Sequence, residues 1–298
     1  MLRLEMDFCK KIETPYNGYN PAIEIYGNQF LYFFRWEKKV CEAPFFVSYG
    51  IISDEGEFDK SVSVKTLLSN PKPETNNEYD PKILKIGDNN YLIISIHGAG
   101  IIQRHFSIFN RNVHFSSPTK FDAINFQMNF FEKNWVPSKH ENEIYLIYNT
   151  KPHVILKYNI SGCVMKVYET EVNTDWDAKW GFISGGTPPV LLPNGEYITF
   201  FHSFNSQNRE NNKVPREYFT GAYCFEGKPP FKVTKMTPEP LTWDGLYKTK
   251  TQSPHKVIFP NGMVLKNNQL CMSYGENDAS SFLCKFKPER ILDLMKSI

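Results

Sequence analysis

Apolar runs and short polar turns alternate along the chain in a unit that recurs five times. In each copy, a proline begins an apolar run, a turn rich in Asn, Asp, Glu or Gly follows, and a second run opens on an aromatic residue or Leu. The copies span residues 21–34, 81–95, 137–148, 189–201 and 260–274. Runs of β-branched and aromatic residues around such turns predict a β-hairpin in every copy.

The spacing of these hairpins predicts the architecture. The second runs open at Phe30, Tyr91, Tyr145, Tyr197 and Leu270, 52 to 73 residues apart. This is near the period of about 40–50 residues of common propeller repeats, lengthened by loops. We therefore expect an all-β fold, a five-bladed β-propeller that occupies residues 1–298 as a single domain. A β-sandwich would not predict five similar hairpins. One short C-terminal helix of about two or three turns is expected within residues 287–298.

Ionisable side chains follow each second run at equivalent places. They are Arg35, His97, Lys151, His202 and, slightly later in its repeat, Asp278. Because the innermost hairpins of a propeller converge on its axis, these residues predict a polar central pocket. The alternative is that each is an ordinary surface residue at the end of a strand.

Composition agrees with a β fold and excludes several functions. Hydrophobic residues make up 41% and aromatic residues 15%, with 24 Phe and 16 Tyr, which favours pleated sheets. The net charge of +2 gives no field for nucleic acid or an anionic membrane surface. Glu5 and Asp7 interrupt the N-terminal segment where a signal peptide needs an apolar core, and no run approaches a membrane span. We expect a soluble, cytoplasmic protein without nucleic-acid or membrane partners, and the sequence is compatible with a homo-oligomer.

The cysteines show no spacing typical of a disulfide framework or a zinc site. The six are Cys9, Cys41, Cys163, Cys224, Cys271 and Cys284. Without a CxxC pair, they indicate reduced, buried thiols, and we expect neither a metal nor a cofactor.

Several motifs, in order along the chain, resemble those of glycoside hydrolase family 130. Tyr19-Asn20-Pro21 with Arg35 is similar to the first-blade motif, and Tyr79-Asp80-Pro81-Lys82 to the catalytic segment. Further similar segments are Glu132-Lys133-Asn134-Trp135, Gly185-Gly186-Thr187-Pro188-Pro189 with His202, Tyr218 with Gly221-Ala222, Phe259-Pro260-Asn261-Gly262, and Tyr274-Gly275 with Asp278. Each motif is short, and the specificity lies in their order over most of the chain.

The resemblance implies an inverting β-mannoside phosphorylase or hydrolase with a five-bladed propeller fold. It makes Asp80 the general acid, whose proton reaches the glycosidic oxygen through a sugar hydroxyl. Tyr79 would supply neutral surroundings that favour the protonated acid. Asp278 and Asn20 would hold the sugar, and Trp135 would stack on it.

A phosphorylase also needs cationic donors for inorganic phosphate as co-substrate. Arg35, His202 and Lys151 stand where such donors are expected from the resemblance. Two features depart from the family pattern: the stretch before Gly185 reads Phe-Ile-Ser, where a phosphorylase typically has a Lys, and Lys82 replaces an Arg. Phosphorolysis and hydrolysis therefore both stay open.

Two other functions stay open as well. A glycosyltransferase could use a sugar phosphate or nucleotide sugar in the same pocket, although the sequence has neither GxGxxG nor GxxxxGK. A propeller without catalytic activity could bind an oligosaccharide. A hydrolase would need a carboxylate base, for which Glu132, Asp175 and Asp177 are candidates.

Overall fold

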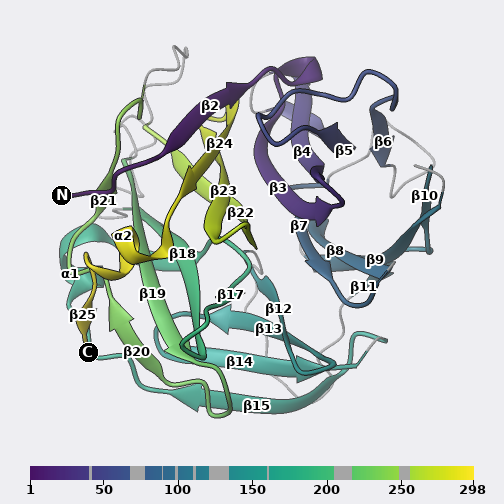
Figure 1. The fold of residues 1–298 in the computed structure, drawn as a ribbon. Coiled ribbons are helices and arrows are strands. Elements are labelled where there is room, and N and C mark those ends of the chain that lie inside the picture. The colour runs from purple at the N-terminus through teal and green to yellow at the C-terminus, as the bar shows by residue number, and fades with distance from the viewer. Residues whose placement is uncertain are drawn as a thin grey trace.

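Antiparallel sheets around a common axis make up the fold (Figure 1). The computed structural model describes residues 1–39, 42–67, 78–88, 90–97, 100–109, 112–120, 134–159, 161–204, 217–247 and 256–298. Within these ranges, five sheets contain four to six strands each, and one further sheet has two strands. The prediction of an all-β propeller is confirmed.

The sheets are formed by segments that follow one another along the chain. The first contains β3 (Tyr19–Tyr26), β4 (Gln29–Lys39), β5 (Glu42–Ile52) and β6 (Lys65–Leu67). The second contains β7 (Lys82–Lys85), β8 (Asn90–His97), β9 (Gly100–Phe109), β10 (Asn112–Phe115) and β11 (Thr119–Lys120). The third contains β12 (Val136–His140), β13 (Glu143–Asn149), β14 (His153–Tyr158) and β15 (Val164–Thr170).

The remaining sheets complete the ring. The fourth contains β16 (Phe182–Gly185), β17 (Val190–Leu191), β18 (Glu196–Phe204), β19 (Tyr218–Glu226), β20 (Val233–Met236) and β25 (Lys296–Ser297). The fifth contains β22 (Ile258–Lys266), β23 (Gln269–Glu276), β24 (Ser280–Phe286) and β2 (Phe8–Ile12). The two-stranded sheet pairs β1 (Leu2–Arg3) with β21 (Leu241–Thr242) in parallel.

Each predicted hairpin is present, and each lies in a different sheet. The pairs are β3 with β4, β7 with β8, β12 with β13, β17 with β18, and β22 with β23. The turn chemistry explains why: Asn267 and Asn268, for example, both adopt left-handed φ angles, of 51° and 59°, as a tight hairpin turn requires. The sequence pattern therefore located the start of each second strand to within two residues, whereas β4 and β18 extend beyond the predicted spans.

The first strands of the hairpins lie at the inner edges of the sheets. Strand β3 contacts β7 on one side and β22 on the other, and β7 also contacts β12. Residues on β3, β7 and β22 therefore meet near the axis, although they are far apart in the sequence.

The seam between the first and fifth sheets joins the two ends of the chain. Strand β2 pairs with β24, so a strand from the start of the chain completes the last sheet. Side chains of this sheet then hold the entrance to β3: Ser281 Oγ donates to the carbonyl of Gly18 (3.0 Å) and Ser273 Oγ to that of Pro21 (2.7 Å). The strands pack closely here, since a Cβ at Gly262 would lie 2.5 Å from the nitrogen of Ile23.

Apolar side chains fill the spaces between neighbouring sheets. Phe34 and Ile23 from the first sheet pack with Cys271 and Leu283 from the fifth, all almost fully buried. A second cluster joins the fourth and fifth sheets, where the rings of Phe200 and Phe286 lie 5.9 Å apart. Because a single sheet cannot bury both of its faces, these contacts hold the ring together.

The helices are short. A 3-10 turn (Pro15–Asn17) precedes β3, and α1 (Trp176–Trp180) follows β15. The C-terminal helix α2 (Pro288–Leu292) has only five residues, fewer than the two or three turns predicted. The segment leaves the helix because residues 296–297 form β25, which pairs with β20. Ile291 is fully buried in the core beneath α2.

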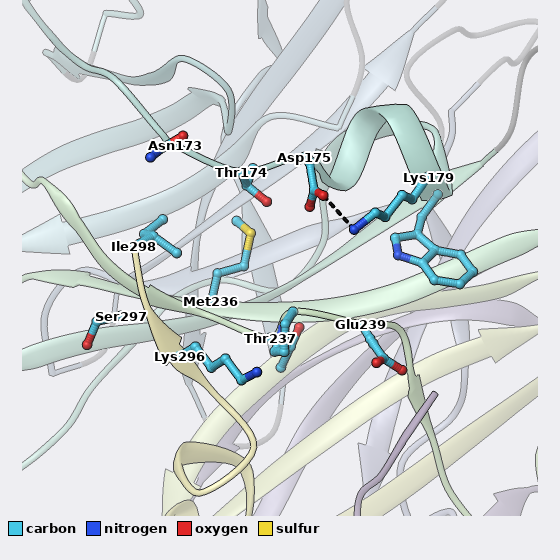
Figure 2. A pocket seen from close by; sticks show the side chains of 12 residues that line it. Asn173, Thr174, Asp175, Lys179, Met236, Thr237, Glu239, Lys296, Ser297 and Ile298 are labelled. Carbon is cyan, nitrogen blue, oxygen red and sulfur yellow. Dashed lines mark ion pairs between the residues drawn. The ribbon is translucent and has the colours of Figure 1, made fainter.

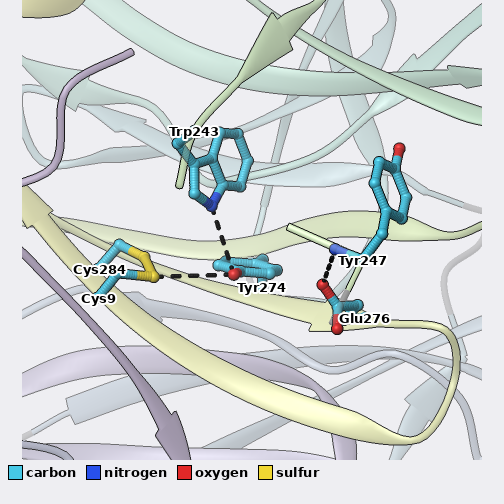
Figure 3. The surroundings of a disulfide bond; sticks show 6 residues. All are labelled: Cys9, Trp243, Tyr247, Tyr274, Glu276 and Cys284. Carbon is cyan, nitrogen blue, oxygen red and sulfur yellow. Dashed lines mark hydrogen bonds between the residues drawn. A yellow bond between two sulfur atoms is a disulfide. The ribbon is translucent and has the colours of Figure 1, made fainter. Parts of the chain in front are cut away.

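The cysteines differ in part from the prediction of reduced thiols. Cys9 and Cys284 form a disulfide, because they are direct cross-strand partners on β2 and β24 (Figure 3). A spacing of 275 residues gave no signal of this pair. Cys163, Cys224 and Cys271 are free thiols, and Cys41 lies outside the described residues.

The surroundings of the disulfide belong to the apolar cluster that joins the fourth and fifth sheets. Tyr274 on β23 lies beside it, with its hydroxyl 3.7 Å from the Cys9 sulfur, and accepts a hydrogen bond from Trp243 Nε1 (3.4 Å). Nearby, the backbone N–H of Tyr247 donates to buried Glu276 (2.5 Å). Figure 3 shows these contacts around one face of the last sheet.

Among the residues that the structure describes, no helix has the length and apolar character of a membrane span. The compartment stays a prediction. Disulfides persist in oxidising compartments, so in the predicted cytoplasm this bond would be exposed to reduction.

We expect the change Cys9→Ser to lower the free energy of unfolding by about 2–4 kcal/mol, because the disulfide restricts the unfolded chain over a long loop. Cys9 is exposed, so the replacement leaves no cavity. Urea unfolding under oxidising and reducing conditions measures the effect. Reductant should destabilise the unmodified protein and leave the variant unchanged; equal stabilities throughout would contradict a role of this bond in closing the ring.

Candidate functional site

Asp80 lies in a polar group where the first, second and fifth sheets meet. Asn20 Nδ2 donates a hydrogen bond to Asp80 Oδ1 (2.8 Å), and Arg35 Nη1 lies 3.5 Å from the same oxygen. Glu37 and Asp278 complete the group, which we call the Asp80 cluster. The side chain of Asp80 is 15% exposed, so the carboxyl is held by protein donors and still reaches solvent.

Asn20 is placed by an unusual backbone conformation at the start of β3. Its φ angle is +48°, a left-handed value that Asn tolerates better than most residues, and β3 has a register shift between Tyr19 and Ala22. A Cβ at Gly275 would lie 2.0 Å from Asn20 Oδ1. Glycine at this position therefore lets β23 approach and leaves the Asn20 amide directed at Asp80.

Arg35 sits in an aromatic enclosure. Its guanidinium carbon lies 4.5 Å from the ring centres of Phe45 and Tyr79, and 5.1 Å from that of Tyr19. Glu37, two residues along β4 and hence on the same face, lies 4.0 Å from Arg35 Nε and accepts a hydrogen bond from the Tyr19 hydroxyl (2.5 Å).

The charges of the cluster explain its ionisation. Burial lowers the pKa of Arg35, but the neighbouring Asp80, Tyr19 and Glu37 raise it by more, so the net shift is upward and the guanidinium stays charged. In contrast to its effect on Arg35, burial raises the pKa of the Tyr19 hydroxyl. One cation therefore balances several acidic groups.

Asp278 is the carboxyl of the cluster with the clearest shift. It lies in the turn between β23 and β24 with a left-handed φ of 49°. Burial raises its pKa to about 6, against the lowering effect of Arg35 and with a further increase from Asp80 and Glu37. Asp278 therefore exchanges its proton at a higher pH than an ordinary aspartate, about one pH unit below neutrality.

The structure thus brings together five of the predicted site residues. Asn20, Arg35, Tyr79 and Asp80 are in contact or share a partner, and Asp278 interacts with them through its charge. Tyr79 lies on the guanidinium of Arg35, whereas the sequence analysis placed it only as neutral surroundings of Asp80.

His202 lies at the edge of this region. Its buried ring packs 4.5 Å from Phe259 on β22, and the Lys82 ammonium lies 5.2 Å from the centre of the same Phe259 ring. One aromatic side chain thus links His202, from the fourth sheet, to Lys82, which directly follows the Asp80-Pro81 segment.

Other predicted residues have different surroundings. Lys151 donates to the carbonyl of Thr174 (2.6 Å) and pairs with Asp177 (3.4 Å). Trp135, proposed to stack on a sugar, is 2% exposed and belongs to the core with Leu84 and Leu146, and we leave it out of the site. His97 ends β8 but its side chain, like all of Glu132, lies outside the described residues.

The sequence analysis missed three members of this region. Tyr19 was noted only as part of a motif, and Glu37 was not considered, although its position two residues after Arg35 on a strand predicts the same face. Asn261 was noted in a motif without a role. Its signal was a polar amide within an apolar strand, a position that demands hydrogen-bond partners.

A separate cavity of about 660 Å³ lies beside α1 and the edge strand β25 (Figure 2). Its lining includes Asp175, which pairs with Lys179 (2.5 Å), and Lys296 and Ser297 of β25. No member of the Asp80 cluster lines it. Asp175, one candidate base, therefore belongs to the outer surface of the fourth sheet.

No group of three or more metal-binding side chains occurs in the part of the chain that the structure describes. What the cluster offers chemically is a held carboxyl that can exchange a proton, with donors and acceptors around it for hydroxyl groups.

Solved structures share the fold at low sequence identity. β-1,2-Mannobiose phosphorylase from Listeria innocua, in complex with β-1,2-mannobiose, is 16% identical, with a TM-score of 0.67 over 97% of this chain and 93% of that one. A glycosyl hydrolase from Bacteroides ovatus is 16% identical, with a TM-score of 0.65 over 92% and 85%. MPT-1, a GDP-Man-dependent mannosyltransferase from Leishmania mexicana, is 13% identical, with a TM-score of 0.58 over 95% and 91%.

None of the curated proteins matches the chain. The family model of glycoside hydrolase family 130, described as beta-1,4-mannooligosaccharide phosphorylase, matches residues 3–297. Since that match covers nearly the whole sequence, the protein belongs to glycoside hydrolase family 130.

Proposed function

We propose that this protein cleaves β-mannosides with inversion and that Asp80 is the general acid. The observation that carries the proposal is the geometry of Asp80: Asn20 and Arg35 hold one carboxylate oxygen, while the side chain remains partly exposed. A proton donor must be fixed in this way and still reach its substrate.

In the proposed reaction, Asp80 gives its proton to a sugar hydroxyl, which passes its own proton to the glycosidic oxygen as the bond to the anomeric carbon breaks. The nucleophile attacks that carbon from the opposite face, so the configuration inverts. The nucleophile is phosphate or water. The proton that it releases restores the acid, and no charge accumulates over the cycle.

Asp278 has a binding role in this proposal. A carboxyl that is partly protonated near neutral pH can both donate to and accept from a hydroxyl group. That versatility suits a sugar, whose hydroxyls need partners of both kinds. It also agrees with the role that the family resemblance implies for this position.

Phosphate is our preferred nucleophile, because the description of the matching family model names a phosphorylase. The most accessible of the predicted cationic donors is Lys151, with 30% of its side chain exposed beside Asp177. Arg35 is engaged by Asp80 and Glu37, so it would bind phosphate only by sharing its donors.

Mannosyl transfer is the second candidate. Its supporting observations are the shared fold with the GDP-Man-dependent enzyme MPT-1 and the stretch Phe-Ile-Ser before Gly185, where the phosphorylase pattern has a Lys. In such a reaction the same pocket would accept mannose from an activated donor.

We expect the change Asp278→Asn to stabilise the folded protein at pH 8 by about 1–2 kcal/mol, which is less than the full linkage value because the group is partly exposed. The folded pKa of about 6 lies above the ordinary 3.8, so the stability associated with this carboxyl is present below about pH 4 and lost as the pH rises through 6.

Urea unfolding of both proteins at pH 4 and pH 8 measures this difference. The gain should vanish at pH 4, where both proteins are neutral at this position. Asp244→Asn is a suitable control because the Asp244 side chain is 86% exposed. A gain of equal size at both pH values would show that the ionisation of Asp278 is not its cause.

We expect Asp80→Asn to lower turnover by at least about 10³-fold, within the range that a general acid contributes. The replacement keeps an oxygen to accept from Asn20, so the fold should be unchanged. The assay supplies β-1,2- and β-1,4-mannobiose with and without phosphate and, separately, GDP-mannose with a mannoside acceptor. Mass spectrometry identifies mannose 1-phosphate, free mannose or a longer chain.

Asp293→Asn, an exposed carboxylate at the end of α2, should retain full activity. Mannose 1-phosphate formed only with phosphate supports phosphorolysis, whereas transfer from GDP-mannose supports the second candidate. If Asp80→Asn turns over like the unmodified protein, the proposed acid is wrong. No reaction on any of these substrates would reject the proposed function.

A further inference from the structure

Lys82 is a buried cation two residues beyond Asp80. Only 2% of the residue is exposed, and its ammonium donates to Asn261 Oδ1. Among the described residues, no carboxylate lies within ion-pair distance of the Lys82 ammonium. Burial of a charge without such a partner costs several kcal/mol, so the presence of this lysine calls for a compensating role.

Asn261 connects the lysine to both sides of the acid. It is fully buried on β22, where the ladder shifts register between Pro260 and Gly262. Its Nδ2 donates to the carbonyl of Pro81 (2.7 Å) and to the carbonyl of Asn20 (2.8 Å). All the hydrogen-bonding atoms of this side-chain amide are thus used, and its orientation is fixed by three partners.

The two peptides that Asn261 holds carry the two side chains that meet in the site. Asn20 belongs to β3, Pro81 follows Asp80, and the Asn20 amide donates to the Asp80 carboxylate. A rotation of Asn261 would release both peptides and change the distance between Asn20 and Asp80. Lys82 prevents this rotation because its ammonium accepts no hydrogen bond and can pair only with the oxygen of the amide.

The charged and aromatic groups around Lys82 also connect this residue with Asp80. Burial lowers the pKa of Lys82 to about 7, and the charge of Asp80 acts against this lowering. The ring of Phe259, 5.2 Å from the ammonium, adds a cation–π contact. The charge of Asp80 therefore helps to keep part of the Lys82 population protonated near neutral pH.

We propose that Lys82 and Asn261 act together as positioning residues that hold Asp80 and Asn20 in the geometry needed for proton transfer. The inference rests on the proposed function of Asp80. Neither residue needs to contact substrate, since both act through backbone carbonyls of the first and second sheets. Misplacement of a reacting group by about 1 Å can cost about 100-fold in rate.

The test compares Lys82→Met, which removes the charge and the donor, with Lys82→Arg, which keeps both. We expect Lys82→Met to lower kcat by about 100-fold with KM within about threefold of the unmodified protein, and Lys82→Arg to restore kcat to within about tenfold. Lys139→Met, an exposed lysine on another inner strand, β12, is the control and should retain full activity.

The outcomes separate this inference from the proposed function. If Asp80→Asn is inactive while Lys82→Met keeps the kcat of the unmodified protein, the acid stands and the positioning role is rejected. If Lys82→Arg is as impaired as Lys82→Met and both unfold cooperatively at the normal temperature, a role of the cation is rejected. Absence of turnover in the unmodified protein removes the proposed function and, with it, this inference.

Lys82→Gln covers the case in which Lys82→Met does not fold. Gln buries no charge and keeps a donor for Asn261, although its side chain is one atom shorter. We expect it to lower kcat by about tenfold at unchanged KM. A folded Lys82→Gln protein with unchanged kcat would also reject the positioning role.

Discussion

The pairing of β2 with β24 is the constraint on which the rest of the molecule depends. It completes the fifth sheet with a strand from the start of the chain, and that sheet supplies the side chains that hold residues 18–21. Gly18, Asn20 and Pro21 each present a carbonyl to a donor from β22, β23 or β24. Closing the ring and placing Asn20 beside the acid are therefore one structural event.

The second constraint is the shortage of positive charge near the axis. Arg35 faces Asp80 and Glu37 in an aromatic enclosure, and Asp278 is close enough for its charge to act on the guanidinium. Aromatic walls limit the water that would otherwise screen these charges. Small displacements of the guanidinium thus change the balance of the whole cluster, and the stacking of Tyr79 and Phe45 limits such displacements.

Local patterns predicted what local chemistry controls. Hairpins depend on turn residues and on β-branched or aromatic strands, so all five could be located, and residues shared by the family identified Asn20, Arg35, Tyr79 and Asp80. Contacts between distant segments could not be predicted in this way. The Cys9–Cys284 pair and the bonds of Asn261 join residues 179 or more positions apart, and nothing in their neighbours encodes the partner. From the sequence alone, Trp135 could belong to the core or stack on a sugar ring. Only its burial in the structure distinguishes the two roles.

The hydrogen bonds from the fifth sheet to residues 18–21 also order events during synthesis. Residues 18–21 leave the ribosome early, whereas their partners Asn261, Ser273 and Ser281 are made much later. Contacts of such sequence separation form slowly, because a long loop must close before they are gained. Through most of translation the growing polypeptide therefore has sheets but no assembled Asp80 cluster, and its unpaired inner strands are the surfaces that chaperones would need to shield.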